Sequence, residues 1–439
     1  MPKINPFAPT SPVNPGMFVG RIPELDRLES CLLQARAGRP VSFMITGERG
    51  IGKSSLLNYI KWVAEGYIPA SGVTLNFLVV DTDIDASTSR QGLLEKIRLG
   101  LEDKLDKTES ARSFLKDTWS FLQRVEAGGL KLKAADRDEA EELLLEKFCY
   151  ALADLAARVT SPDPGLFSAT YDGILILIDE ADNASHALGL GALLKLLTER
   201  LQRRGCSRLL FGLAGLPHLR DVLHESHPSS LRVFEEVPLD TLSDREVSRV
   251  IDLCLADADK ENPTPTTIAD DARGFLIFLS EGYPHFIQQF GFSAFAADTN
   301  NTIEVADIEA GGFGHGGALE RIGDRYYRND YYNKIQSESY RRVLRIMADH
   351  GNQWTTTDTI RAAFKGKESI LTNAIKALLD RKIIVAKEGS SGVYRLHHRG
   401  FAWWIKLYTT DQYQLTQMLE STRDSTAEAT ATPEPKANT

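Results

Sequence analysis

The stretch SFMITGERGIGKSSLLNYI, residues 42–60, joins a short apolar run, a glycine-rich turn and an amphipathic segment. It contains the pattern G-x-x-x-x-G-K-[ST], in which glycines let successive backbone N–H groups point at a phosphate. The flanking residues predict a strand at 41–46 and a helix at 54–65, the context that such a loop requires. We therefore expect a phosphate site formed by Gly47, Glu48, Arg49, Gly50, Ile51, Gly52, Lys53, Ser54 and Ser55.

A second motif completes this site. The apolar run GILILIDEAD, residues 173–182, ends in acidic residues. Asp179 is placed to hold Mg²⁺ through water together with the Ser54 hydroxyl, and Glu180 is placed to polarise the attacking water. Lys53 is expected to reach the β- and γ-phosphate oxygens. The two motifs predict hydrolysis of Mg–ATP, with Lys53 and Glu180 as catalytic residues and Ser54 and Asp179 as metal ligands.

The order of segments along the chain predicts several domains. Strand-like and helix-like segments alternate over residues 17–240, which indicates a nucleotide-binding domain with a parallel five-stranded sheet covered on both faces. A helical insertion is expected at about 89–165, and a helical lid at 241–330. Residues 331–412 show three helices followed by two strands around a Gly-Ser-Ser-Gly turn, the pattern of a winged helix-turn-helix domain. Residues 1–16 are a Pro-rich arm and 413–439 a disordered tail.

Composition and charge limit the function classes. The chain has 439 residues, no apolar run long enough to span a membrane, and no signal-peptide pattern, so we expect a cytoplasmic protein. Its four cysteines are far apart, which predicts reduced core residues and no zinc site. Net charge is −9, yet residues 321–400 contain 16 Lys and Arg against 8 Asp and Glu. This basic segment predicts a local anionic partner.

These motifs, with FVGRIPEL at 18–25, resemble the AAA+ superfamily and its STAND-like relatives. The resemblance covers residues 17–410 and is closest in character to ATPases related to origin-recognition initiators and to transposition ATPases. It implies that FVGRIPEL lines the adenine through Val19, Gly20 and Arg21, although Ile22 stands where the family has Glu. The alternative is an ordinary helix start with a hydrophobic staple.

The resemblance also implies an arginine finger that reaches the γ-phosphate of a neighbouring subunit. Arg232, in SLRVFEEVPL, occupies the matching segment just before the fifth strand. The alternative is a surface arginine paired with Glu235 or Glu236. The preceding helix offers three competing residues, Arg200, Arg203 and Arg204.

Two further family features are matched only in part. GYPHFIQ, residues 282–288, resembles the lid motif, so Pro284 would start a helix facing the nucleotide and His285 would contact phosphate or merely cap and pack. The lid arginine of the family is not evident. The polar residue that ends the fourth strand in the family, its first sensor, is missing from FGLAGLP, residues 211–217.

The third helix of the C-terminal unit, residues 369–381, has an apolar face that includes Ile370 and a polar opposite face. Phosphate and base contacts to duplex DNA are expected from Lys365, Lys367, Thr372, Asn373, Lys376, Lys382 and Lys387. The alternative is a packing or autoinhibitory module. The closing aromatic segment FAWWIKLY is expected to pack on the ATPase core or on a partner. Lys131 and Lys133 form either a DNA-contacting hairpin or an ordinary loop.

Three functions are consistent with these observations. The first is a DNA-associated AAA+ ATPase that forms homo-oligomers on binding ATP and engages double-stranded DNA. The second is a STAND-type signalling or defence switch whose C-terminal domain packs on the ATPase core or binds a protein effector. The third is an ATPase acting on protein clients, against which the sequence shows no aromatic–hydrophobic–glycine pore loop after the second strand.

Overall fold

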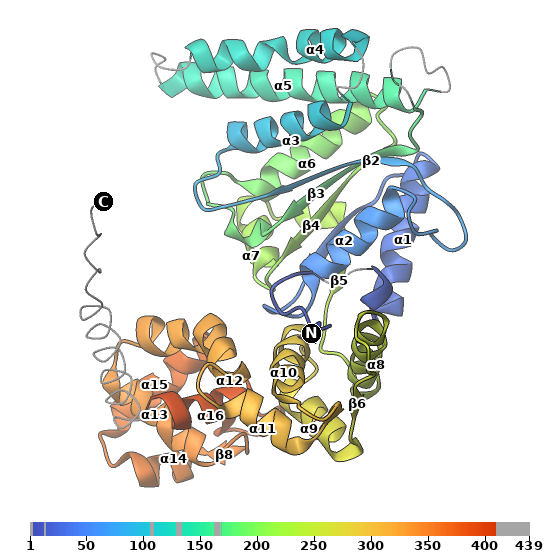
Figure 1. Cartoon of the computed structure of the whole chain (residues 1–439). Helices are drawn as coiled ribbons and strands as arrows, with labels where there is room; N and C mark the ends of the chain where they lie inside the picture. The colour runs from blue at the N-terminus through green and yellow to red at the C-terminus, as the bar shows by residue number, and fades with distance from the viewer. Residues whose placement is uncertain are drawn as a thin grey trace, which may run out of the picture. The chain divides into compact units, whose positions relative to one another are not determined.

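The computed structural model describes residues 3–12, 15–105, 109–128, 134–161, 167 and 169–409. Contacts divide the chain into two compact units (Figure 1). The nucleotide unit is Thr10–Leu242, and the C-terminal unit runs from Ser243 onward and includes the chain up to Pro9. Lys131, Lys133 and the expected tail at 413–439 lie outside the described residues. No helix within the described ranges is long and apolar enough to cross a membrane.

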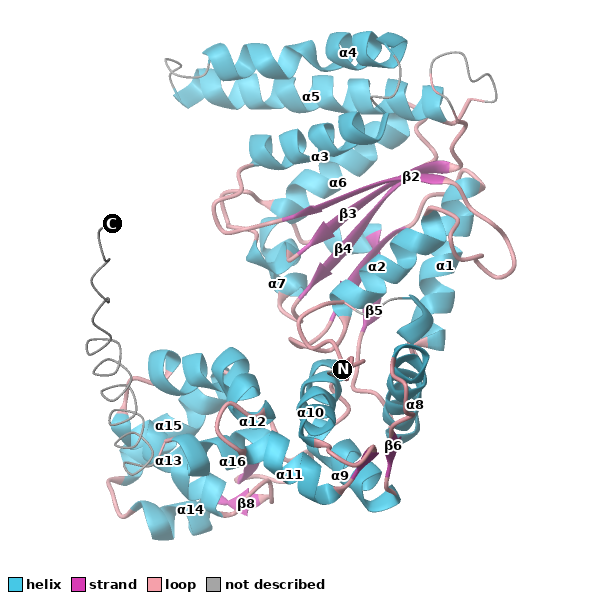
Figure 2. Cartoon of the chain, viewed as in Figure 1, coloured by secondary structure: helices cyan, strands magenta, loops and turns pink. Residues whose placement is uncertain are grey.

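A five-stranded parallel sheet in the order β2-β3-β4-β1-β5 forms the centre of the nucleotide unit (Figure 2). Every residue of β1 and β4 is buried, as expected for central strands with helices on both faces. The predicted parallel α/β sheet is therefore confirmed. Its strands are β1 (Ser42–Thr46), β2 (Phe77–Asp83), β3 (Gly173–Asp179), β4 (Leu209–Gly215) and β5 (Phe234–Pro238).

Helices cover both faces of this sheet (Figure 1). One face carries α1 (Ile22–Arg36) and α2 (Lys53–Ala64), and the other carries α3 (Arg90–Leu105), α6 (Leu190–Arg203) and α7 (Leu219–Ser226). The expected helical insertion forms a further layer outside α3 and α6, made of α4 (Glu109–Gly128) and α5 (Ala134–Val159). Trp119 of α4 packs on Phe148 of α5 in the same core as the sheet, so this layer is an integral part of the unit. The short helices η1 (Pro15–Met17), η2 (Ala181–Asn183) and η3 (Ser230–Val233) lie in connections.

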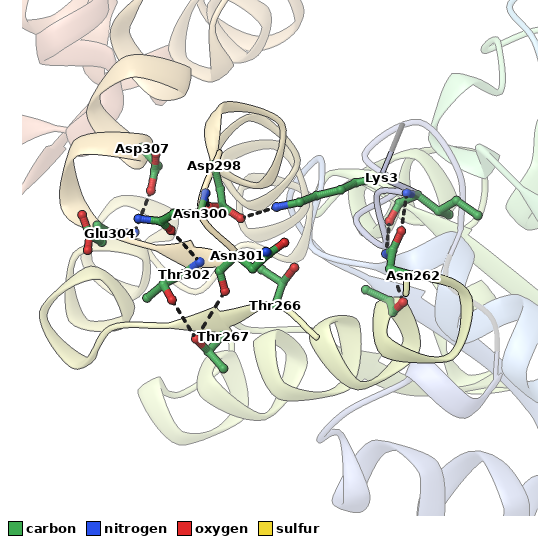
Figure 3. Close-up of polar contacts among 12 residues, drawn as sticks. Lys3, Asn262, Thr266, Thr267, Asp298, Asn300, Asn301, Thr302, Glu304 and Asp307 are labelled. Atoms are coloured by element: carbon green, nitrogen blue, oxygen red, sulfur yellow. Dashed lines mark hydrogen bonds and ion pairs between the residues drawn. The ribbon is translucent and has the colours of Figure 1, made fainter. Parts of the chain in front are cut away.

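The C-terminal unit begins with a group of helices. Ser243 and Glu246 form a capping box at the start of the first of them, α8. A two-residue parallel pairing of β6 with β7 joins the loops before α9 and α11 (Figure 3). The elements are α8 (Asp244–Glu261), β6 (Thr267–Ile268), α9 (Asp270–Ser280), α10 (Pro284–Ala297), β7 (Thr302–Ile303), α11 (Val305–Phe313), α12 (Ala318–Ile322) and the π-helical segments η4 (Gly323–Tyr327) and η5 (Asp330–Lys334).

Helices and a small antiparallel sheet follow in the same unit. The three helices and two strands lie where the sequence predicts them, and a third strand, β8, adds an edge that its two-residue length hid from prediction. The sheet order is β8-β10-β9. The elements are α13 (Glu338–Asp349), β8 (Thr355–Thr356), α14 (Thr357–Phe364), α15 (Glu368–Asp380), β9 (Ile384–Ala386), β10 (Val393–Leu396) and α16 (Arg399–Tyr408).

The N-terminal strap, residues 3–9, lies on α8 and α10. Lys3 pairs with the buried carboxylate of Asp298 at 2.7 Å, and the backbone of Ile4 exchanges two hydrogen bonds with the Asn262 side chain, of 2.7 and 2.9 Å (Figure 3). Phe7 is buried against Gly291, where an added Cβ would lie 2.4 Å from its ring. The strap has irregular backbone, as expected for a Pro-rich arm, but side chains fix it in place.

The aromatic residues of α16 pack within the C-terminal unit. Trp404 is buried against the rings of Tyr327 and Tyr331, and Trp403 contacts Phe278 of α9. A carboxylate oxygen of Glu281 accepts hydrogen bonds from the first two N–H groups of α16, at 2.7 and 3.2 Å. The prediction that these aromatics pack on the ATPase core or a partner is therefore wrong, because the helices of their own unit cover them.

Candidate nucleotide-binding site

Three neighbouring strands of the nucleotide unit end at one edge of the sheet. Register pairs Thr46 of β1 with Gly215 of β4, and Ile178 of β3 with Leu213 of β4. Because β4 lies between β1 and β3, the residues that follow these two strands converge above the end of β4. The glycine-rich loop and the acidic residues after β3 are therefore brought together, as the sequence predicts.

The loop between β1 and α2 has the backbone of a phosphate cradle. Gly50 and Gly52 have φ angles of 80° and 100°, a conformation that is costly for residues with a Cβ. Gly47 has no room for a side chain, since a Cβ there would lie 2.8 Å from Ile51 Cγ2. Helix α2 begins at Lys53, so its first free N–H groups and its positive dipole end face the loop. This geometry suits a bound phosphate.

Lys53 lies inside the loop. Its Nζ donates to the carbonyl oxygens of Gly47 and Glu48, at 2.8 and 2.9 Å. Burial lowers the pKa of Lys53, and the nearby carboxylates of Asp182 and Asp179 oppose that shift. The ammonium group is thus held at the centre of the loop, where the sequence expects it to meet phosphate oxygens.

Ser54 and Asp179 meet across the two motifs. The Ser54 hydroxyl donates to Asp179 Oδ2 at 2.8 Å, although 125 positions separate the two residues. A hydroxyl and a carboxylate are hard oxygen donors, the kind that Mg²⁺ prefers when it is shared with nucleotide phosphates and water. The described residues contain no cluster of three or more His, Cys, Asp or Glu side chains suited to a metal.

Glu180 has an unusual backbone. Its φ of 52° places a non-glycine residue in the left-handed region, which is often occupied at functional sites. This turn exposes its side chain, and Oε2 accepts a hydrogen bond from Asn183 Nδ2 at 3.2 Å. Its N–H donates to Asp179 Oδ1 at 2.8 Å, which orients the neighbouring carboxylate. The arrangement is compatible with the predicted role of Glu180 as the base that positions water.

The segment before α1 reaches the glycine-rich loop. Arg21 is buried, has a φ of 63°, and donates from Nη2 to the carbonyl of Ile51 at 3.2 Å. Phe18 packs on Tyr59 of α2, with ring centroids 5.0 Å apart. Val19 and Gly20, between them, are half-buried. The structure thus brings this box to the phosphate loop, and its contact with adenine stays a prediction.

Arg232 lies at the other edge of the sheet. It belongs to η3, just before β5, and its side chain is exposed. The acids proposed as its surface partners pair with other residues: Glu235 with Arg27, and Glu236 with Arg220, both at 2.6 Å. The competing residues Arg200 and Arg204 pair with Glu142 and Glu146 of α5, and Arg203 is exposed.

Pro284 and His285 belong to the C-terminal unit. Helix α10 begins at Pro284, as predicted. Burial lowers the pKa of His285 to about 4, the charge of Arg325 adds to this, and a hydrogen bond to the backbone of Pro9 opposes it. The ring packs beside Tyr326. Contact of these two residues with nucleotide stays a prediction.

The candidate DNA-binding residues lie around α15. All are exposed, and within the described ranges none of their lysines forms an ion pair: Lys365, Lys367, Thr372, Asn373, Lys376, Lys382 and Lys387. Arg361 of α14, by contrast, pairs with Glu368 and Asp358. Ile370 was predicted to lie on the buried face of this helix, but it is 36% exposed because it lies in the first turn, beyond the packed core.

Sequence reasoning missed two polar residues at this site. Asp182, in η2, has a side chain that is only 8% exposed, and its Oδ1 accepts a hydrogen bond from the N–H of Leu216 at 2.9 Å. His218, the residue before α7, has its Nε2 3.8 Å from Asp182 Oδ2. The signal for Asp182 was present in IDEAD, but only the pairing of β3 with β4 brings it to His218.

Comparison with known proteins agrees with this geometry. Residues 17–210 match the family described as AAA ATPase domain. No curated protein matches the sequence. The fold is similar to the Aeropyrum pernix ORC2 protein in ADPNP–ADP complexes, with 14% identity and a TM-score of 0.54 over 91% of this chain and 95% of that one.

Two other solved structures align with most of the chain, with lower TM-scores. The Aeropyrum pernix ORC1 protein in complex with DNA has 16% identity and a TM-score of 0.42 over 91% of this chain and 94% of that one. Pyrobaculum aerophilum Cdc6p has 11% identity and a TM-score of 0.42 over 92% and 96%. Residues 17–210 therefore match an AAA ATPase domain. The chain as a whole has a fold like that of an archaeal ORC protein, and the expected resemblance is confirmed.

Proposed function

We propose that this protein is an ATP-hydrolysing AAA+ ATPase that couples Mg–ATP binding and hydrolysis to self-assembly and to engagement of double-stranded DNA. The observation that carries the proposal is the convergence of Lys53, Ser54, Asp179 and Glu180 at one edge of the sheet, with Ser54 and Asp179 in direct hydrogen-bond contact at 2.8 Å. A carboxylate free to act on water, beside a phosphate loop, favours turnover over structural retention of nucleotide.

Each residue has a separate task in this proposal. The loop N–H groups and Lys53 bind and orient the phosphates, and Ser54 and Asp179 would hold Mg²⁺, which would supply positive charge to neutralise the developing phosphate charge. Glu180 orients water in line with the γ-phosphate. Arg21 keeps the adenine side of the site in contact with the loop through its hydrogen bond to the Ile51 carbonyl.

Assembly is proposed because Arg232 is remote from the site of its own subunit. Strand β5 pairs in parallel with β1, Phe234 opposite Ser42, so Arg232 precedes the start of β5 while the phosphate loop follows the end of β1. Arg232 is exposed and, among the residues that the structure describes, has no ion pair. Its guanidinium is therefore available to the γ-phosphate of a second copy, where it would stabilise transition-state charge.

DNA engagement is proposed through residues 337–409 acting as a winged helix-turn-helix. Helices α14 and α15 stand in the positions of the helix-turn-helix pair, and β9 and β10 form the wing. Exposed Thr372, Asn373 and Lys376 on α15 are of the types that contact base edges and phosphates. Exposed lysines before and after the helix add contacts to the DNA backbone.

The nucleotide part of the proposal is tested with Glu180→Gln. This variant should bind ATP, hydrolyse it at least about 100-fold more slowly, and accumulate as an ATP-bound oligomer. Turnover would be measured by phosphate release, and assembly by light scattering with ATP and with ADP. Asp221→Asn, which changes an exposed acid in the first turn of α7, serves as control and should behave as the parent. Hydrolysis by Glu180→Gln at the parent rate would show that the assignment of the base is wrong.

The DNA part is tested by titrating the full chain with duplex DNA across a salt series. Binding should weaken linearly in log–log form as salt rises, since lysine–phosphate contacts release counterions. ATPase turnover should rise with DNA at low salt. Absence of binding at low salt would contradict DNA engagement and favour a protein effector as the partner of this surface.

A further inference from the structure

The end of β4 has no polar side chain of its own, yet a carboxylate occupies that place. A Cβ added to Gly215 would lie 2.7 Å from Asp182 Oδ1 and 3.1 Å from the backbone nitrogen of Asp182. Asp182 also accepts the hydrogen bond from Leu216 N, so its carboxylate is fixed to the backbone that leaves β4. Glycine at 215 is therefore what lets the acid from β3 reach across the strand end.

The second oxygen of this carboxylate faces His218. Nε2 lies 3.8 Å from Oδ2, which is longer than a hydrogen bond. The imidazole side chain is 51% exposed, whereas the Asp182 side chain is 8% exposed. The buried acid thus faces one nitrogen of the ring. The other part of the ring stays open to a ligand.

This pair lies next to the phosphate loop. The N–H of Gly47, the first residue of the loop, donates to the carbonyl of Gly215 at 3.3 Å. Asp182 is hydrogen-bonded to the residue that follows Gly215, so its carboxylate lies at the same strand end as the loop.

We propose that His218, held by Asp182, supplies the contact to the γ-phosphate, or to the water that attacks it, that a polar residue at the end of β4 would otherwise make. This rests on the proposed function, because it deepens the same nucleotide site. His218 is the binding group, and Asp182 is a positioning residue that acts through it. With Nε2–H facing Asp182, donation from Nδ1 requires the imidazolium form of the ring, which a γ-phosphate oxygen would stabilise by accepting that hydrogen bond. This contact exists with a nucleoside triphosphate and is lost with a diphosphate.

The proposal predicts that loss of His218 weakens the binding of a nucleoside triphosphate more than the binding of a diphosphate. His218→Ala should lower the affinity for a non-hydrolysable ATP analogue roughly tenfold and change the affinity for ADP less than about twofold. It should lower kcat on the order of 10²-fold with a smaller change in KM, because the contact strengthens as charge develops. Calorimetric titration of the full chain with each nucleotide and steady-state phosphate release measure these quantities.

Matched variants separate this role from a structural one. His218→Gln, whose amide can donate from a similar position, should recover part of kcat and of the analogue affinity. Asp182→Asn keeps an oxygen that accepts from Leu216 N but removes the charge, so it should lower kcat while ADP still binds. His224→Ala changes an exposed histidine on the same helix, α7, and should match the parent.

The outcomes also distinguish this inference from the proposed function. Equal loss of analogue and ADP affinity in His218→Ala, or parent kcat in that variant, would overturn the role of His218. A parent chain that binds both nucleotides without turnover would contradict the proposed hydrolysis. The ratio of analogue affinity to ADP affinity in His218→Ala would still show whether His218 contacts the γ-phosphate. A parent chain that binds neither would overturn both.

Discussion

The two candidate sites of this molecule, the carboxyl edge of the large sheet and the exposed face of α15, arrange their charges in opposite ways. At the sheet edge, one lysine and two acids converge in a partly buried space, and Ser54 meets Asp179 at 2.8 Å. Around α15, lysines stand apart and exposed. The first arrangement suits a compact ligand whose charges have fixed positions. The second suits a long polyanion that supplies many equivalent charges.

The largest effect is expected at the sheet edge. Lys53→Ala should reduce kcat/KM for ATP by two to three orders of magnitude, roughly, because it removes the cation inside the phosphate loop. DNA binding measured without nucleotide should change far less, since the two sites use different charges. Lys61→Ala, on the same helix and paired with Asp81 at the surface, is the control and should retain ATP turnover. An equal loss of ATP turnover and of DNA binding in Lys53→Ala would show that the two sites do not act independently.

Each lysine around α15 should contribute a separate, additive part of the DNA affinity, whereas loss of Lys53 alone should remove most of the ATP turnover. Replacing Lys365, Lys367 and Lys376 together by alanine should weaken duplex DNA binding roughly tenfold or more at 0.1 M salt. The log–log salt slope should fall by about 0.9 for each lysine that contacts a phosphate. Fluorescence anisotropy at several salt concentrations measures both quantities.

The control for this set is Lys116→Ala, an exposed lysine on α4 of the nucleotide unit. It removes the same kind of charge from a different surface and should leave the slope unchanged. A triple variant whose slope equals that of the parent would show that DNA, if bound, contacts another face of the protein.

The smallest effect concerns pH and the C-terminal unit. Burial lowers the pKa of His398 to about 3, helped by His397, and that of His285 to about 4. Both rings stay neutral in the folded unit at pH 5, whereas the unfolded chain binds protons below about pH 6.5. The unfolded state therefore binds more protons, and stability falls as pH drops from about 6.5 towards 4. At pH 5 the loss is about 2 kcal/mol per histidine.

Calorimetry of the full chain at pH 7 and pH 5 measures this loss. Added ADP raises the unfolding temperature of the nucleotide unit, so the transition that ADP does not shift belongs to the C-terminal unit. His398→Phe should flatten the pH dependence of that transition, whatever its effect at pH 7. His350→Asn changes an exposed histidine of the same unit and should keep the parent pH dependence. Unchanged dependence in His398→Phe would contradict a neutral buried ring.

The candidate nucleotide site was predictable where its signal is local. Apolar runs predicted the five strands, and GERGIGKS together with DE predicted Lys53, Ser54, Asp179 and Glu180, because the loop needs those residue types at those spacings. Asp182 and His218 were not predicted, since their meeting depends on β3 lying beside β4. The surroundings of Arg232 were not predicted for the same reason. Glu235 pairs with Arg27 and Glu236 with Arg220, and these pairs depend on how distant segments pack.

The C-terminal unit shows more clearly what local sequence patterns do not predict. Helical periodicity predicted α13, α14 and α15, but the cover over α16 was assigned to the wrong part of the molecule. No local pattern links Trp403 to Phe278, which lies in a helix more than a hundred positions earlier. Residues 3–9 lack any periodic signal, and their order comes from partners as distant as Asp298.

This N-terminal strap has a consequence for how the protein is made. Lys3 is synthesised before its partner Asp298, which follows 295 positions later. At a synthesis rate of roughly 5–20 residues per second, roughly 15–60 s pass between the synthesis of Lys3 and that of Asp298. The nucleotide unit, Thr10–Leu242, is synthesised in that interval, so the strap can bind its partners only after that unit has been made.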